Sequence, residues 1–493
     1  MSRFKNVKYT AASSVAFLVY GTSLADWDSL PFFRAFRFYS IAVPAYLHYE
    51  WVDRVYTSGR SERFERLHEK YSPIMHQNVL AMRGFFLKAA QLMSVRDDYL
   101  PVQYAKWTQM MQNEAPVSFS SEEAQKIVTE EFNIAKISDM FSHWDPVPVG
   151  SASIGQVYRA VLLNGDSVAV KVQAPFVESQ FRADLHACKF FCSFALPHLV
   201  VSLEEIERQF ETEFDYVAEG INLAEIRANL LPVWSNLVEV PRVHASSKRV
   251  LIMDFIEGDK ISDFFARHLK IISEKTGKSV FDLRRELKDQ VMKQDLSSNR
   301  MTWIRRVGAW FKGEPDIVHI LNLAMDVHGY QIFQNRTFNG DPHPGNLLIT
   351  PEGKLGLVDF GQVKRLSTER TRDVAKLIIA LHHDDKKSVC DIMKKLGFET
   401  KQNDPDTVWR LTTFWFDRDT QDITLGMDIH KFLQEMEERD PQVSLCQDLV
   451  LVSRCSVMLR SIALGLGLRI RTTDYWYKYA QEFLDGAERP KSS

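Results

Sequence analysis

Two spacings of apolar residues divide this chain into helical and strand-like regions. Between residues 61 and 140, apolar side chains recur every three or four positions with few turn signals, which predicts consecutive amphipathic helices. Near Pro146 the pattern changes. The apolar runs 151–163 and 167–173 flank an Asn-Gly-Asp turn, and Asn-Gly accepts the positive φ angles that tight hairpins need. A small antiparallel sheet is therefore expected to begin there.

The rest of the chain is predicted to be mostly helical. Helical spacing returns at 176–194 and 202–230, so that residues 211–220 are expected within a helix. An apolar run at 249–261 predicts a buried strand that leaves through a glycine-containing connector, and short strands are expected at 345–350 and 354–361. This order of elements predicts an α+β, two-lobed enzyme with its cleft between the lobes.

Four segments follow from these patterns. Residues 1–55 are interpreted as an N-terminal targeting or membrane-proximal segment, and 56–145 as a helical extension. Residues 146–258 are predicted to form the sheet-containing N-terminal lobe, and 259–493 the helical C-terminal lobe, with an insert near 285–315.

The first 25 residues have an unusual charge pattern. They contain Arg3, Lys5 and Lys8 but no acid before Asp26, and the run from Tyr9 to Ala25 is uncharged. An acid-poor start of this kind is typical of organelle transit peptides, and the uncharged run is close to the shortest length that spans a bilayer. We expect a transit peptide or short membrane anchor, with an ordinary surface helix as the alternative.

Composition limits the class of protein. The 493 residues are 45% hydrophobic and 25% charged, which is typical of a globular chain. The formal net charge of −3 provides no overall positive field, so no nucleic-acid partner is expected. The five cysteines include no C-x-x-C pair, which favours reduced thiols over a disulfide framework or a zinc site.

Three polar residues occur in the order and spacing that phosphoryl transfer needs. Asp341 and Asn346 have the D-x-x-x-x-N spacing of a kinase catalytic loop, and Asp359 opens an Asp-Phe-Gly sequence further along. Phosphoryl transfer needs a carboxylate aimed at the acceptor, an oxygen ligand for Mg²⁺, and a second carboxylate that links the metal to the phosphates. Asp341, Asn346 and Asp359 are predicted to supply them in that order.

Upstream residues are predicted to hold ATP. Lys171 ends a Val-Ala-Val-Lys strand and would contact the α- and β-phosphates, while backbone groups around Asp254 and Ile256 would hold adenine. A carboxylate must hold Lys171 in place. Glu219 is the preferred partner, with Glu213 or Asp215, on the same predicted helix, as alternatives. The predicted phosphate loop contains Gly150, Ser151, Ala152, Ser153, Gly155 and Val157, with alanine at position 152 where a kinase has its middle glycine.

Together these motifs resemble the UbiB/ADCK family of atypical kinases, also called AarF-domain-containing kinases. The similarity covers roughly residues 75–370 and is carried by SASIGQVYRAVL, VAVKVQAP, EFDYVAEGINLAEI, MDFIEG, GDPHPGNLLI, LVDFGQV and, upstream, FLKAAQLMSVRDDYLP. It implies a protein-kinase-like fold whose N-terminal helical extension covers the cleft. It also implies an alanine-rich phosphate loop, although Gly150 and Ser151 stand where alanines are usual.

The resemblance assigns further residues. Lys88-Ala89-Ala90-Gln91 matches the family's K-x-G-Q motif with alanine for glycine, so Lys88 and Gln91 are expected to reach the active site. The methyl group of Ala90 is expected to hinder close helix contact. Glu213 and Asp215 match an E-x-D motif.

The implied function is that of a mitochondrial, membrane-associated kinase or ATPase that uses ATP and Mg²⁺. Its substrate would be a lipid or quinone-like molecule, and it would have protein partners in a mitochondrial membrane complex. The alternatives are an ATP-binding regulatory scaffold with little turnover and a small-molecule phosphotransferase. The basic, aromatic segment 299–313 is expected either to touch a membrane surface or to pack on the helical lobe.

Overall fold

The computed structural model describes residues 31–56, 58–94, 101–110, 119–151, 154–197, 200–280, 282–283, 286, 316–444, 446–465 and 468–488. Backbone contacts divide the chain into two compact units. Unit 1 comprises Met1–Asp139, Trp144–Tyr158 and Lys171–Phe214, and unit 2 comprises Met140–His143, Arg159–Val170 and Asp215–Ser493. The segment boundaries drawn from the sequence stay predictions.

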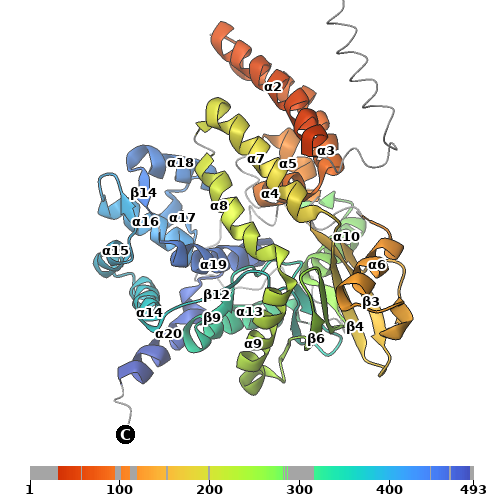
Figure 1. Ribbon diagram of the computed structural model, residues 1–493. Coiled ribbons are helices and arrows are strands. Elements are labelled where there is room, and N and C mark those ends of the chain that lie inside the picture. Colours follow the sequence, from red (N-terminus) through yellow and green to blue (C-terminus); the bar gives the residue numbers. More distant parts are fainter. Residues whose placement is uncertain are drawn as a thin grey trace, which may run out of the picture. The chain divides into compact units, whose positions relative to one another are not determined.

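Unit 1 is built mainly from helices, as the spacing between residues 61 and 140 predicts. Its helices are α2 (Pro31–Val55), α3 (Arg60–Met82), α4 (Gly84–Ser94), α5 (Val102–Met110), α6 (Ser121–Phe132), α7 (Val177–Ala195) and α8 (Val200–Glu211) (Figure 1). A buried ion pair between Arg34 and Asp184 joins α2 to α7. Small apolar cores lie between α2 and α3 and around Ala90 of α4.

The predicted hairpin is present in a sheet of short strands. Its members are β1 (Phe141–Trp144), β2 (Gly150–Ser151), β3 (Gly155–Leu162), β4 (Ser167–Gln173), β6 (Val243–Ser246) and β7 (Val250–Asp254). The order is β1-β3-β4-β7-β6, with β2 paired to β3. Gly165 has a φ of 91° in the turn between β3 and β4, which explains the Asn-Gly sequence there.

The single helical stretch predicted around residues 211–220 is wrong. Helix α8 ends at Glu211, a 3₁₀ turn covers Thr212–Phe214, and α9 (Tyr216–Trp234) begins anew. The break occurs because Asp215 is extended and its carboxylate accepts hydrogen bonds from the backbone N–H groups of Val217 (2.9 Å) and Ala218 (3.2 Å). An aspartate that caps a helix in this way ends the preceding one.

Unit 2 contains a second sheet that positions the connector after β7. Strands β5 (Val238–Glu239), β11 (Leu355–Leu357), β10 (Leu347–Ile349) and β8 (Asp259–Lys260) lie in that order. The connector passes so close to β10 that a Cβ atom at Gly258 would lie 2.6 Å from the carbonyl oxygen of Ile349. Only glycine fits this approach.

The remainder of unit 2 is largely helical, as predicted, with short strand pairs that the sequence did not reveal. The helices are α10 (Ile261–Thr276), α13 (Ile317–Tyr330), a π turn η6 (Gln331–Asn335), α14 (Thr368–His382), α15 (Lys386–Lys395), α16 (Pro405–Phe416), α17 (Gln421–Thr424), α18 (Ile429–Arg439), α19 (Gln447–Gly465) and α20 (Thr473–Glu488). Strand β9 (Thr337–Asn339) pairs with β12 (Val363–Arg365), and β13 (Glu399–Thr400) with β14 (Gln442–Ser444). One large apolar core, which includes Trp476, joins many of these helices.

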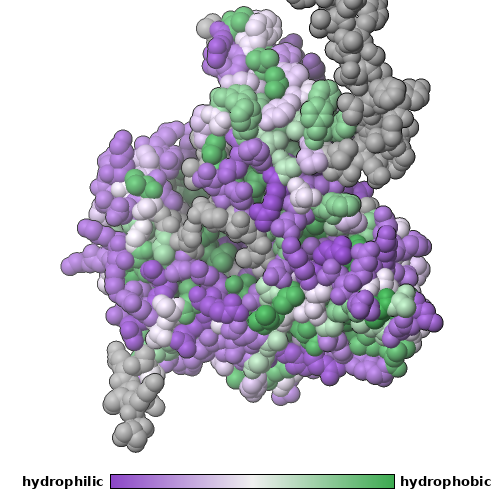
Figure 2. All heavy atoms as spheres, viewed as in Figure 1, coloured by the Kyte–Doolittle hydropathy of each residue, from purple (hydrophilic) through white to green (hydrophobic). Residues whose placement is uncertain are grey.

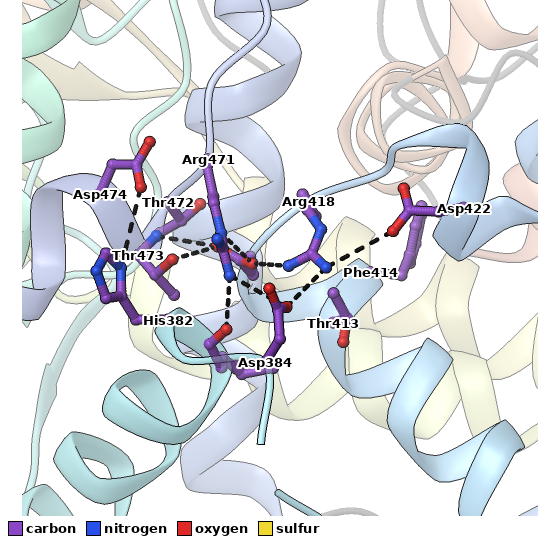
Figure 3. A network of polar contacts seen from close by, with 12 residues as sticks. His382, Asp384, Thr413, Phe414, Arg418, Asp422, Arg471, Thr472, Thr473 and Asp474 are labelled. Atoms are coloured by element: carbon purple, nitrogen blue, oxygen red, sulfur yellow. Dashed lines mark hydrogen bonds and ion pairs between the residues drawn. The ribbon is translucent and has the colours of Figure 1, made fainter. Parts of the chain in front are cut away.

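A buried polar network joins α14, α16 and the start of α20. The carboxylate of Asp417, which is fully buried, binds Arg418 at 2.7 Å and Arg471 at 2.8 Å and accepts a hydrogen bond from the Thr473 hydroxyl at 2.6 Å. Both arginines also contact the carboxylate of Asp384, after the end of α14 (Figure 3).

Some sequence predictions fall on residues outside the described part of the chain. They are the uncharged run 9–25, the aromatic segment 299–313, and Ala152 and Ser153 of the phosphate loop. Within the described residues, no helix has both the length and the apolarity that crossing a membrane requires. All five cysteines are free thiols.

Candidate nucleotide and metal site

The short strand pair β9–β12 brings the Asp341 loop beside the Asp-Phe-Gly segment. Asn339 pairs with Val363 in the antiparallel register, and the N–H of Gly340 donates to the carbonyl of Gln362 at 2.7 Å. The loop leaves β9 at Gly340, whereas the Asp-Phe-Gly sequence leads into β12. Residues about 20 positions apart in the chain are thus held together by backbone pairing.

Asn339 links these two segments through its side chain. Its Nδ2 donates to the backbone carbonyl of Asp359 at 2.7 Å, and its Oδ1 accepts from the N–H of Asp341 at 3.0 Å. The Asn339 N–H donates to Oε1 of Gln331, which lies in the π turn η6. Asn339 is 3% exposed, so loss of these bonds would leave buried polar groups unpaired. The sequence motifs did not identify this residue.

The two predicted metal ligands belong to the two segments that this link joins: Asn346 to the Asp341 loop and Asp359 to the Asp-Phe-Gly segment. The backbone N–H of Val358 donates to the carbonyl of Asn346 at 3.3 Å, which holds Asn346 beside the strand end that precedes Asp359. The Asn346 amide nitrogen donates to the carbonyl of Asp341 at 3.4 Å, and this bond does not use the amide oxygen. A carboxylate and an amide oxygen suit Mg²⁺, which is usually held by one or two such ligands together with water and phosphate oxygens. The residues present therefore fit a magnesium ion.

Glu219 lies against the Asp-Phe-Gly segment. It is 3% exposed on α9, and the N–H of Phe360 lies 3.5 Å from its Oε1. Asn222, one turn further along α9, donates to the carbonyl of Phe360 at 3.2 Å, and the Phe360 ring is fully buried. Helix α9 thus supports the segment that carries Asp359. The predicted pairing of Glu219 with Lys171 stays a prediction, because Lys171 belongs to unit 1 and Glu219 to unit 2.

Arg454, a residue that the sequence analysis missed, binds the predicted catalytic carboxylate. It lies on α19, and its guanidinium group contacts Oδ1 of Asp341 at 2.8 Å and Oε1 of Gln362 at 2.7 Å. Both charged side chains are about one-fifth exposed. The next residue, Cys455, is fully buried with its Sγ 3.3 Å from the carbonyl of Asn339, and burial raises the pKa of its thiol.

The predicted adenine segment follows β7. Asp254 is the last residue of β7, where its N–H donates to the carbonyl of Arg242 and its carboxylate binds His244 at 2.7 Å. Ile256 lies beyond the strand, and a Cβ atom at Gly356 of β11 would meet its Cγ2 at 3.2 Å. Ile256 therefore packs against β11, while the Asp254 N–H is already used within the sheet.

The phosphate-loop residues form the ends of a hairpin in unit 1. Gly150 and Ser151 on β2 pair with Val157 and Gln156 on β3, and Gly155 is the first residue of β3. Lys171 lies on the neighbouring strand β4 and is half-buried. Ala152 and Ser153, which follow Ser151 in the sequence, lie outside the described residues.

Lys88 and Glu213 form an ion pair within unit 1. The ammonium nitrogen of Lys88 lies 3.3 Å and 3.5 Å from the two carboxylate oxygens of Glu213 and 4.8 Å from the centre of the Phe210 ring. The pair is mostly buried, at 18% and 11% side-chain exposure. Glu213, an alternative partner for Lys171, thus binds Lys88, and Asp215 caps α9. The Gln91 side chain lies outside the described residues.

Ala90 occupies the position of the motif's glycine and is fully buried. It packs with Val79, Leu87 and Trp107 in the small core formed by α3, α4 and α5. Its methyl group is therefore part of the contact between these helices. Within the described residues, no cluster of three or more His, Cys, Asp or Glu side chains suits a metal ion.

Comparisons with known proteins point to one family. Residues 110–393 match the model of the ABC1 atypical kinase-like domain. An Arabidopsis thaliana protein named activity of BC1 complex kinase 7, chloroplastic, is 26% identical over 85% of this chain, and the match spans 55% of that protein. AarF domain-containing protein kinase 1 from Gallus gallus is 28% identical over 78% of this chain and 68% of its own length.

A solved structure also resembles the chain. It is the complex of Rv3197 with erythromycin from Mycobacterium tuberculosis, which is 19% identical, covers 88% of this chain and 100% of its own, and has a TM-score of 0.48.

Proposed function

Since the chain belongs to the ABC1 atypical kinase-like family, the UbiB/ADCK family of the sequence analysis, we propose that it binds ATP with Mg²⁺ and acts as a phosphotransferase or ATPase. The main support is the Asn339 link, which holds the Asp341 loop and the Asp359 segment at fixed distances. Such positioning is most of what a protein contributes to phosphoryl transfer.

The residues take the following roles in this proposal. Asp341 accepts the proton of the attacking hydroxyl group or water, and Asn346 and Asp359 hold the metal. Lys171 and the hairpin of β2 and β3 contact the phosphates. Bound Mg²⁺ would neutralise the negative charge that develops on the phosphoryl oxygens.

The proposal extends to location and substrate. The acid-free start of the chain supports import into an organelle, and the Arabidopsis relative carries the word chloroplastic in its name. We place the chain at a mitochondrial membrane, in contact with membrane-complex proteins and acting on a lipid or quinone-like molecule. No nucleic-acid partner is proposed, because the net charge is −3.

An ATP-binding regulatory scaffold is the second candidate function. The ion pair between Arg454 and Asp341 favours it, because the arginine already occupies Oδ1, one of the two oxygens with which this carboxylate would contact an acceptor. The two candidates differ in turnover. A scaffold binds Mg-ATP without releasing phosphate, whereas an enzyme releases it and loses that activity in Asp341→Asn with binding retained.

Thermal unfolding with and without Mg-ATP tests the proposal. We expect Mg-ATP to stabilise the wild-type protein by about 2.7 kcal/mol at one hundred times its Kd and Asp359→Asn by much less, because the triphosphate charge is then poorly neutralised. Asp391→Asn, an exposed acid on α15, is the control and should respond like wild type. An equal shift in wild type and Asp359→Asn would remove Asp359 from the site.

A further inference from the structure

Helix α2 has a row of large apolar side chains facing solvent. Phe32, Phe36, Leu47, Trp51 and Val55 are 73%, 66%, 59%, 52% and 53% exposed. Their spacings of four, eleven, four and four residues each advance by about 20–40° around a helix of 3.6 residues per turn, so together they cover an arc of about 140° on one side of the helix. Ser40 and Pro44, which fall on the same face between them, are also exposed. We call this face the α2 stripe.

The opposite face of α2 is the one that packs on the protein. The guanidinium group of Arg34 binds Asp184 of α7 and the carbonyl of Met82. At the edge of the α2 stripe, Nε of Arg37 donates to Asn78 of α3 at 3.0 Å. Ala45 and Val52 are buried on the same side. The α2 stripe is therefore not needed to attach the helix to unit 1.

The charges of α2 are distributed in the reverse of the pattern expected for a water-exposed helix. Up to Tyr49 its basic residues are Arg34 and Arg37, and both contact protein groups. On the outer face, charges occur near the end of the helix, where Glu50 and Arg54 form an ion pair at 2.6 Å. A helix that faces water carries polar residues on its outer face. An apolar row about 35 Å long indicates contact with another apolar surface.

We propose that the α2 stripe lies on a lipid bilayer. A single helix forms a ridge, which fits a flat interface where its apolar side chains enter the boundary of headgroups and acyl chains. Figure 1 shows α2 at the outer edge of its group of helices, and apolar residues coloured green reach the surface in the same region of Figure 2. Phenylalanine, leucine and tryptophan are the residues that such interfacial helices use.

The sequence before α2 supports the bilayer over other occupants. The uncharged run from Tyr9 to Ala25 ends five residues before the helix, and five residues reach at most about 20 Å. If that run is a membrane anchor, it leaves α2 close to the bilayer surface. The proposed function includes contact with a membrane, and the inference identifies the surface that makes this contact. It therefore rests on that part of the proposed function, whereas the proposed nucleotide binding does not depend on the α2 stripe.

Flotation of the full-length protein with phosphatidylcholine vesicles tests the inference. In the variant Phe36→Ser/Leu47→Ser/Trp51→Ser we expect the partition constant to fall at least tenfold, because three apolar side chains no longer leave water. The matched control is Phe176→Ser/Phe190→Ser/Phe194→Ser, which removes three other exposed rings of unit 1 and should partition like wild type. High salt should leave the difference unchanged, because apolar contact is not screened.

Quenching of tryptophan fluorescence by brominated phosphatidylcholine gives a direct readout. Trp51 is expected to supply a quenched component that disappears in Trp51→Phe. This measurement does not depend on whether the triple serine variant folds correctly. It uses Trp51→Phe, in which the phenylalanine keeps the apolar contact. Quenching that is identical in wild type and Trp51→Phe would overturn the inference.

The other possible occupants predict different results. If a second copy covers the α2 stripe, the serine variant changes from dimer to monomer in light scattering while its vesicle partition stays the same. If another part of the chain covers it, the serine variant melts several degrees lower without lipid. Either result overturns the inference. The Mg-ATP stabilisation of the same variant should equal that of wild type, so failure of the proposed nucleotide function is detected separately.

Discussion

At the scale of single residues, the predicted catalytic carboxylate depends on a partner from a distant helix. Arg454 holds Oδ1 of Asp341 and, with a second nitrogen, the side chain of Gln362, which follows the Asp-Phe-Gly sequence. One guanidinium group thus connects the Asp341 loop to the residue that follows the Asp-Phe-Gly sequence. A planar, two-pronged contact of this kind fixes a side-chain direction more firmly than a lysine can.

Arg454→Met is therefore expected to lower the rate of phosphate release about ten- to hundredfold, because Asp341 loses its fixed direction. Mg-ATP stabilisation should be unchanged, because Arg454 contacts neither predicted metal ligand. Arg454→Lys keeps the charge and should restore part of the rate. A higher kcat in Arg454→Met would show that the arginine restrains Asp341 instead.

Arg454 and its neighbours show which residues sequence motifs can identify and which they cannot. Asp341, Asn346 and Asp359 were predicted because they match the spacing of a kinase catalytic loop and an Asp-Phe-Gly sequence. Arg454 comes about a hundred residues after Asp359, and helical packing alone brings it to the site, so no local pattern marks it. Asn339 has a weak signal, since it stands two residues before the aspartate, but its role depends on the β9–β12 pairing.

At the scale of elements, buried charge holds the end of the chain in place. Asp417 follows α16 and accepts bonds from Arg418, Arg471 and Thr473 without any exposure to water. Asp384 joins the same two arginines from the end of α14. Because Thr473 is the first residue of α20, the network determines where that helix begins.

Asp417→Asn should lower the free energy of unfolding by about 3–5 kcal/mol, because the buried guanidinium group of Arg418 and the partly buried one of Arg471 then face an amide instead of a carboxylate. Urea unfolding measures the change. Asp422→Asn is the matched control: Asp422 contacts Arg418 at 3.6 Å but is 63% exposed, so its loss should cost less than about 1 kcal/mol. Similar losses in the two variants would mean that burial of Asp417 does not decide its contribution.

Helices and strands with one buried side were predicted well. The prediction was less good where hydrogen bonds between a side chain and the nearby backbone compete with the apolar spacing in deciding the local structure. The helices of 61–140 and the β3–β4 hairpin agree with their apolar spacing and turn residues. The break at Asp215 was missed because apolar spacing continues through it, although an aspartate before an apolar run is a known start signal. Strands of two or three residues, such as β9 and β12, are too short to show a period.

At the scale of the whole molecule, one buried histidine links stability to pH. His328 on α13 is fully buried, and its Nδ1 lies 2.8 Å from the carbonyl of Ala324. Burial lowers its pKa from 6.5 to about 4, since the charged form would lose its hydration. The unfolded chain therefore binds a proton at this site between these pH values, while the folded chain does not.

It follows that stability falls as pH drops from 6.5 towards 4, with a slope of up to about 1.4 kcal/mol per pH unit from this group. Urea unfolding over this range should show a shallower slope in His328→Leu than in wild type, whatever the absolute stability of the variant. His186→Leu, at an exposed position, should keep the wild-type slope. Equal slopes in all three proteins would mean that His328 is protonated in the folded state.

The buried thiol of Cys455 gives experimental access to motions beneath the site. Its sulfur lies against the carbonyl of Asn339, so an alkylating reagent reaches it only while α19 is separated from β9. When reclosure is faster than alkylation, the observed labelling rate is proportional to the equilibrium population of that open state. The chain thus contains a native reporter with which the free energy of local opening can be followed as nucleotide, pH or temperature is changed.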